Sequence, residues 1–155
     1  MTFKNEREFE RYLLKKCRLA LLKAQDEVYV IIKKFLYQYY TEYSPEMYDR
    51  TLQLLESLVQ SRIVSDGKGY KAEIYFNISE LNYTSGGQPT GEQVMAAATR
   101  GLHGAIGKIP NSDKYFRYVD IGDGTKVWDD PKKVLDAKAI NILKQMLISE
   151  GIPIK

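Results

Sequence analysis

The 155-residue sequence has 44% hydrophobic and 28% charged residues, an ordinary composition for a globular protein large enough to bury one core. A net charge of +3 is too small to indicate a nucleic-acid partner by itself. The single cysteine, Cys17, excludes an intramolecular disulfide and fits a reducing compartment. The start has no apolar signal-peptide core, and no segment is apolar enough to cross a bilayer. We therefore expect one domain over residues 1–155, folded in a cytoplasm.

Residues 5–40 predict one unusually long amphipathic helix. Apolar side chains recur there every three or four residues, and neither Pro nor Gly interrupts the run. These apolar positions are Phe9, Leu13, Cys17, Ala20, Ala24, Val28, Ile31, Phe35 and Tyr39. At 1.5 Å per residue such a helix is about 54 Å long, more than a compact domain of this size requires. We expect it to bend or to contact a partner.

The middle of the chain predicts a helical elbow and a small sheet. Ser44 and Pro45 are typical of a helix start, and apolar spacing extends this second helix over 45–62. An extended conformation of 58–64, paired as a hairpin, is the alternative. Alternating apolar and polar residues predict strands at 70–78 and 115–121, with a short third strand at 126–128.

Glycines, prolines and alanines divide the remaining segments. Residues 79–92 and 107–113 predict loops, and 92–102 predicts a short helix that ends at Gly101 or Gly104. Asp130 and Pro131 open a final helix over 131–150, which Gly151 and Pro153 end. The order predicts an α+β domain. The long helix and its elbow pack on a small antiparallel sheet within 65–128, followed by the C-terminal helix.

The candidates for catalysis or ligand binding are weak. His103, the only histidine, has no nucleophile beside it, so a structural role is favoured over a catalytic one. Residues 101–108 depart from a phosphate-binding loop, because five residues separate its glycines and Ile109 replaces the Ser or Thr. Residues 120–125 lack the ligand spacing of a calcium loop. We expect no catalytic residue, metal or cofactor, and a protein that is not an enzyme; an enzyme using His103 with nearby acids is the least favoured alternative.

Two surface features indicate a partner. Tyrosine occurs twelve times, against one tryptophan, and its large contact area with a polar tip suits interfaces, although a core edge explains it equally well. Residues 1–41 carry nine basic and five acidic side chains, which form a solvated helix face or a stripe that follows phosphates. The expected oligomer or partner interface comprises Tyr37, Tyr39, Tyr40, Tyr43, Tyr48, Lys15, Lys16, Gly86, Gly87 and Pro89.

The elbow contains Pro45, followed by Thr51, Leu54 and Ser57. This arrangement resembles a family of small tailed-phage neck, or tail-completion, proteins. Their long N-terminal helix is followed by a proline and by a T-G-x-L-x-x-S pattern that leads into a strand. Leu52 replaces the glycine of that pattern. Residues 101–104, 128–131 and 147–153 are also similar to divergent Firmicute prophage members.

The resemblance implies a non-enzymatic virion subunit, assembled in the host bacterial cytoplasm into a homo-oligomeric ring at the head–tail junction. The ring would join the connector or adaptor to the tail tube or tail terminator, with DNA passing through its lumen without sequence readout. The alternative is a small nucleic-acid-binding or host-directed inhibitor protein of a mobile element. In that alternative Lys15, Lys16, Arg18 and Lys23 contact the phosphate backbone, and Tyr12 stacks on bases.

Overall fold

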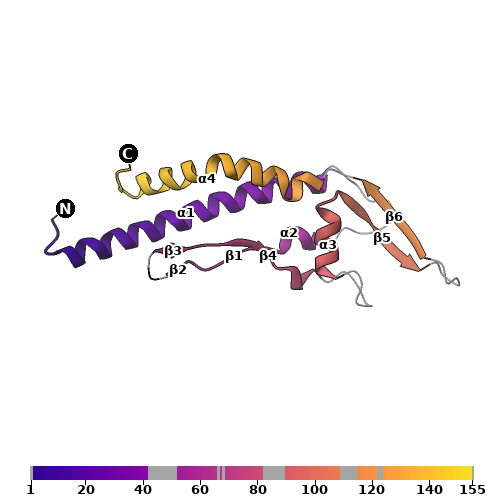
Figure 1. The fold of residues 1–155 in the computed structure, drawn as a ribbon, viewed down its shortest axis with the longest axis horizontal. Coiled ribbons are helices and arrows are strands. Elements are labelled where there is room, and N and C mark those ends of the chain that lie inside the picture. Colours follow the sequence, from indigo (N-terminus) through magenta and orange to yellow (C-terminus); the bar gives the residue numbers. More distant parts are fainter. Residues whose placement is uncertain are drawn as a thin grey trace. The chain divides into compact units, whose positions relative to one another are not determined.

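The computed structural model describes residues 2–41, 52–65, 67, 69–81, 90–108, 115–121 and 124–154. They confirm the α+β class, with a long helix near each end of the chain and short strands between them (Figure 1). The elements are α1 (Glu6–Thr41), α2 (Gln53–Glu56), β1 (Leu58–Gln60), β2 (Val64–Ser65), β3 (Tyr70–Lys71), β4 (Ile74–Phe76), η1 (Ile78–Glu80), α3 (Gly91–Ala98), β5 (Leu102–Lys108), β6 (Tyr115–Ile121), η2 (Gly124–Val127) and α4 (Asp129–Ser149).

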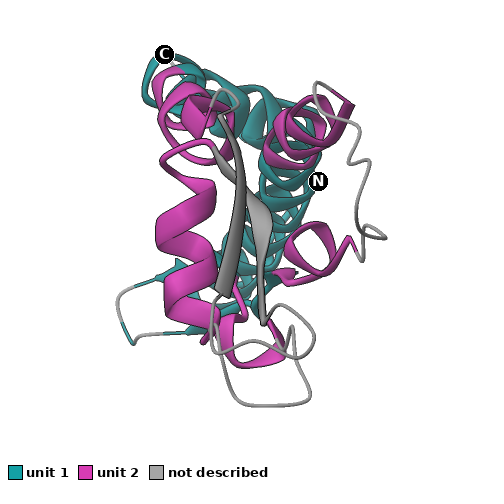
Figure 2. Ribbon diagram, turned by 90° about the vertical axis from the view of Figure 1, so that its right-hand side faces the viewer, with its two compact units in different colours: residues 1–31, 59–75, 134–155 teal, residues 32–58, 76–133 magenta. Residues whose placement is uncertain are grey.

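The chain divides into two compact units, each built from segments that are distant in the sequence (Figure 2). Unit 1 comprises residues 1–31, 59–75 and 134–155, and unit 2 comprises 32–58 and 76–133. Both α1 and α4 contribute residues to both units. The single domain expected over 1–155 stays a prediction.

The long N-terminal helix is confirmed, and its start is fixed by a side-chain cap. Asn5 Oδ1 accepts a hydrogen bond from the Glu8 backbone N–H at 2.9 Å, and the Glu8 carboxylate accepts one from the Lys4 N–H at 2.7 Å. Within the predicted apolar stripe Ala20 and Ala24 are buried, whereas Phe9 is exposed. The first turns of α1 therefore contribute little to the core.

In unit 1, buried Gln25 joins α1 to the strands. Its Nε2 donates hydrogen bonds to the backbone carbonyls of Ser61 at 3.1 Å and Glu73 at 3.0 Å, and the residue is 5% exposed. The Ser61 N–H donates to the Glu73 carbonyl, and the Glu73 N–H donates to Ser61 Oγ, each at 2.8 Å. Because buried polar groups need partners, this cluster fixes the position along α1 at which the strands pack.

Residues 58–62 correct the predicted elbow helix. Within 52–62 only Gln53–Glu56 is helical, and Leu58–Gln60 forms β1, which pairs with β4. The Asn77 N–H donates to the Ser57 carbonyl at 2.6 Å at the end of this antiparallel ladder. Pairing with a partner distant in the sequence outweighs the local helical spacing. Residues 45–51 lie outside the described part of the chain.

The alternative of a partly extended segment at 58–64 is confirmed, because Leu58–Gln60 pairs with β4 and Val64 of β2 pairs antiparallel with Lys71 of β3. The predicted strand at 70–78 is interrupted: β3 and β4 are separated by residues 72–73, and η1 follows from Ile78. The predicted third strand at 126–128 is wrong, since Gly124–Val127 is a 3-10 helix.

The helix predicted at 92–102 is confirmed over Gly91–Ala98, but it ends before 102, and residues 107 and 108 of the loop predicted at 107–113 belong to a strand. Leu102–Lys108 forms β5, which pairs antiparallel with β6 from Leu102 opposite Ile121 to Lys108 opposite Tyr115. The strand predicted at 115–121 is β6. Residues 82–89 and 109–113 of the two predicted loops lie outside the described residues.

In unit 2, two glycines allow backbone segments to approach closely. A Cβ at Gly91, the first residue of α3, would overlap the carbonyl oxygen of Ile78 in η1. A Cβ at Gly124, the first residue of η2, would overlap the backbone of Thr99–Gly101 at the end of α3. Thr90 and Gln93 cap α3 reciprocally at its start.

The final helix is confirmed as Asp129–Ser149, and a glycine ends it. Gly151 has φ 83°, with its N–H donating to the Ile148 carbonyl at 2.9 Å and the Ile152 N–H donating to that of Leu147 at 3.0 Å. These two bonds satisfy carbonyls that the helix end leaves without partners.

We expect Gly124→Ala to lower the free energy of unfolding by roughly 3 kcal/mol, because the added methyl group meets backbone that cannot move aside cheaply. Gly69→Ala is the control, since a Cβ there has nothing within 4 Å and no positive φ. Urea unfolding followed by circular dichroism measures both, and equal midpoints for the two variants would contradict the close contact.

Candidate functional site

A charged cluster in unit 1 joins the end of α4 to α1. The Glu150 carboxylate accepts hydrogen bonds from Lys23 Nζ at 2.5 Å and from Lys16 Nζ at 3.0 Å. The bonds from Lys23 and Lys16 hold the pKa of Glu150 below its usual value, and the bond to Glu150 raises the pKa of Lys16. The two lysines lie on one face of α1 because they are seven residues apart. Lys16 and Lys23 therefore serve the fold of unit 1.

The ion pair with Glu150 distinguishes Lys16 from its neighbour Lys15, although the sequence predicted both as interface residues. Lys15 is exposed and makes no ion pair with any residue that the structure describes, whereas Lys16 is bound to Glu150. Glu150 is 134 residues from Lys16 in the chain, so no local pattern could have indicated it.

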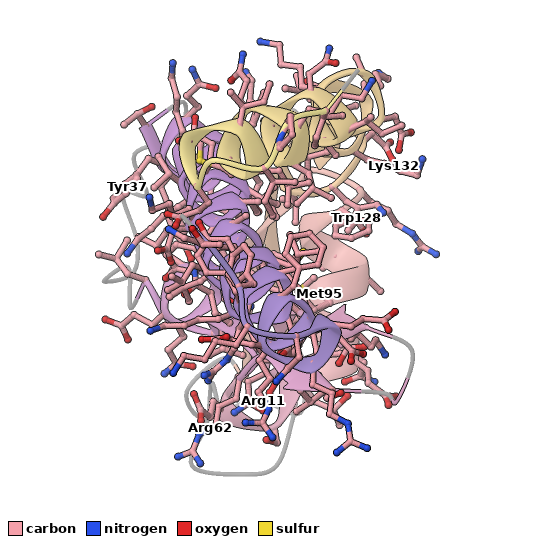
Figure 3. The ribbon with its side chains drawn as sticks, turned by 90° about the vertical axis from the view of Figure 1, so that its left-hand side faces the viewer. Arg11, Tyr37, Arg62, Met95, Trp128 and Lys132 are labelled. Carbon is pink, nitrogen blue, oxygen red and sulfur yellow. The ribbon has the colours of Figure 1, made fainter. Side chains whose placement is uncertain are left out.

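The tyrosines of the predicted interface differ in exposure. Tyr37 is 51% exposed (Figure 3), whereas Tyr39 is buried in unit 2 and Tyr40 is half-buried, with its ring 5.6 Å from that of Tyr39. Among these three, Tyr37 presents the most surface to a partner. The other predicted interface residues lie outside the described part of the chain: Tyr43, Tyr48, Gly86, Gly87 and Pro89.

The elbow pattern has a specific backbone geometry. Leu52, at the position of the pattern's glycine, has φ 55° and ψ 9°, in the left-handed region that favours glycine. Leu54 is buried, and buried Ser57 donates its hydroxyl to the Leu54 carbonyl at 2.8 Å. The Leu52–Ser57 segment is thus a left-handed turn, one short helical turn and a hydrogen-bonded exit into β1. Pro45 and Thr51 lie outside the described residues.

The structure places His103 in β5, opposite Asp120 of β6. Among the residues that the structure describes, no group of three or more His, Cys, Asp or Glu side chains could hold a metal ion. Asp130, in the first turn of α4, accepts hydrogen bonds from Lys133 and Thr125, which lower its pKa.

Several exposed apolar side chains were not singled out by the sequence. In unit 1 these include Leu19 and Val30 of α1 and Ile140 and Ile148 of α4. Val30 is not one of the apolar positions that repeat every three or four residues along the predicted helix. That difference from the pattern is what the sequence offered as an indication of its exposure. No helix among the described residues has the length and apolar character needed to cross a bilayer.

A family model matches residues 5–149, nearly the whole chain. The chain belongs to the YomN family. This family is derived from Bacillus phages, which indicates a phage-related protein. No curated protein and no solved structure matches the chain at a significant level.

We expect Leu52→Gly to raise the free energy of unfolding by about 0.5–1 kcal/mol, because glycine removes the left-handed strain. Leu52→Ala keeps a Cβ and should not stabilise the protein. Urea midpoints of both variants measure the difference; stabilisation by alanine as large as that by glycine would show that φ at residue 52 is not the cause.

The Glu150 cluster makes stability depend on pH in two directions. Because the pKa of Glu150 lies below its ordinary 4.5, its contribution is complete above that value and is lost as pH falls through the lowered pKa. Because the pKa of Lys16 lies above its ordinary 10.5, its contribution is complete below that value and is lost as pH rises through the raised pKa.

We expect the wild-type urea midpoint to fall more steeply than that of Glu150→Gln between about pH 6 and about pH 3. Glu10→Gln, which removes an exposed carboxylate of α1 outside the cluster, should keep the wild-type profile. A Glu150→Gln profile parallel to the wild type would contradict the role of the cluster.

Proposed function

We propose that the chain is a non-enzymatic subunit of a homo-oligomeric ring at the head–tail junction of a tailed phage, where it joins the connector to the tail tube. Membership of a phage-derived family supports the phage setting. The observation that carries the finer proposal is the backbone conformation at Leu52.

The resemblance to neck proteins had its clearest mismatch at this residue, where the pattern has glycine. A glycine is required in a pattern where the chain needs positive φ, and Leu52 has φ 55° despite its side chain. Leu54 and Ser57, the matching residues that the structure describes, are both buried. The local geometry thus agrees with the pattern where the residue type does not, and this supports the resemblance on which the proposal rests.

Exposed apolar side chains in unit 1 support an assembly. Leu19 and Val30 are eleven residues apart on α1, so they lie on nearly the same face of the helix. Val30 is 60% exposed, and α4 adds exposed Ile140 and Ile148. Such groups lose contact with water when a second subunit covers them.

We expect Val30→Asp to fold normally and to lose oligomerisation, because it changes an exposed position. Ile32→Asp, two residues further along the same helix, should not fold, since Ile32 is 5% exposed and a charge there is buried without a partner. Circular dichroism reports folding, and light scattering coupled to size exclusion reports the mass.

The proposal itself is tested with the wild-type chain and with phage particles. Wild type should form a closed oligomer, and a phage lacking the gene should produce filled heads and separate tails that the added protein joins. Val30→Asp should fail to join them. A chain that remains monomeric at high concentration and does not restore head–tail joining would refute the proposed function.

A further inference from the structure

Four cations form a stripe along the N-terminal half of α1 in unit 1. Arg7, Arg11, Lys15 and Arg18 follow one another at steps of four, four and three residues, which places them on one face of the helix. All four are exposed, and Arg11 projects from the ribbon into solvent (Figure 3). At 1.5 Å per residue the stripe is about 16 Å long.

The stripe has no role in holding the described fold together. None of its four side chains makes an ion pair with any residue in the part of the chain that the structure describes. In contrast, Lys16 and Lys23 on the same helix are bound to Glu150. The charge of the stripe is therefore available to a partner.

Two acids of α1 near the stripe accept hydrogen bonds from groups outside it. Glu8 accepts a hydrogen bond from the Lys4 backbone N–H, and Asp26 accepts one from Gln60 Nε2 at 3.2 Å. Neither carboxylate pairs with a cation of the stripe. A partner of negative charge consequently meets four cations in a row that form no ion pair with a described residue.

The composition of the stripe favours phosphate over a lipid surface. Three of the four cations are arginines, whose guanidinium group matches phosphate oxygens bidentately. A helix that lies in a membrane needs a free apolar face, but in this part of α1 Ala20 of the apolar stripe is buried and Leu13 and Cys17 are half-buried, which leaves Phe9 as its one exposed member. Over about 16 Å a DNA duplex presents roughly ten phosphate charges, enough to meet all four cations.

We propose that Arg7, Arg11, Lys15 and Arg18 form a contact surface for the phosphate backbone of double-stranded DNA, without readout of base sequence. The proposal rests on the proposed function for its setting, a ring through which DNA passes. Under this proposal Lys15 contacts DNA and not a neighbouring subunit. Lys16 and Lys23, which the sequence also offered as phosphate contacts, are not part of the surface because they are bound to Glu150.

The test measures binding of the full chain to a duplex of about 30 base pairs between about 50 and about 200 mM salt. Four phosphate contacts per subunit predict an affinity loss of about 150-fold over this range, and the double variant Arg11→Ala, Arg18→Ala a loss of only about 12-fold. Lys138→Ala with Lys144→Ala removes two exposed charges of α4 in the same unit and should keep the wild-type dependence.

Sedimentation of the same proteins separates this inference from the proposed function. The arginine variant should assemble as wild type does; if it fails to assemble, the stripe is a subunit interface and the inference is wrong. No duplex binding at about 50 mM salt, an equal effect of the α4 control, or binding only to vesicles with about 30% phosphatidylserine would also overturn it. Stripe-dependent binding by a chain that never assembles would sustain the inference and refute the ring.

Discussion

The fold depends on one constraint: a single helix, α1, supplies buried residues to both compact units. In unit 1 its contacts are specific and polar, because Gln25 donates to two backbone carbonyls and Lys16 and Lys23 hold Glu150. In unit 2 they are apolar, with Ile32, Leu36 and Tyr39 buried. Apolar burial drives packing but does not fix register, whereas the buried hydrogen bonds of Gln25 select one position of the strands along the helix.

Elements whose signals are local could be predicted from the sequence. The uninterrupted helical period defines α1, the alternation of residues 115–121 defines β6, and Gly151 defines the end of α4 because only a left-handed residue permits its two closing hydrogen bonds. Each of these features is encoded within a few neighbouring residues, so one sequence is sufficient to find it.

Elements that depend on distant partners could not be predicted in the same way. Leu52, Leu55 and Val59 have helical spacing, yet the chain leaves the helix after Glu56 because Leu58–Gln60 finds β4. Gly101 or Gly104 was expected to end a helix and Gly107 to begin a loop, although an isolated β6 required a partner strand and Leu102–Lys108 supplies it. The candidate site shows the same limit. Tyr37 is exposed whereas Tyr39 is buried, and Lys16 is bound to Glu150 whereas Lys15 is not. Neither difference can be read from the neighbouring residues in the sequence.

This limit changes how the charge of the long helix is understood. A count of nine basic residues in 1–41 treats all of them as available, but the half-buried carboxylate of Glu150 beside α1 binds two of them, Lys16 and Lys23. Of the seven other basic residues, Arg7, Arg11, Lys15 and Arg18 form no ion pair with a described acid, and their mutual repulsion offers the monomer no advantage. Two cations of α1 stabilise the fold of unit 1, whereas four others form a regular exposed row without an ion pair to a described residue. A negatively charged partner explains this row better than solvation alone.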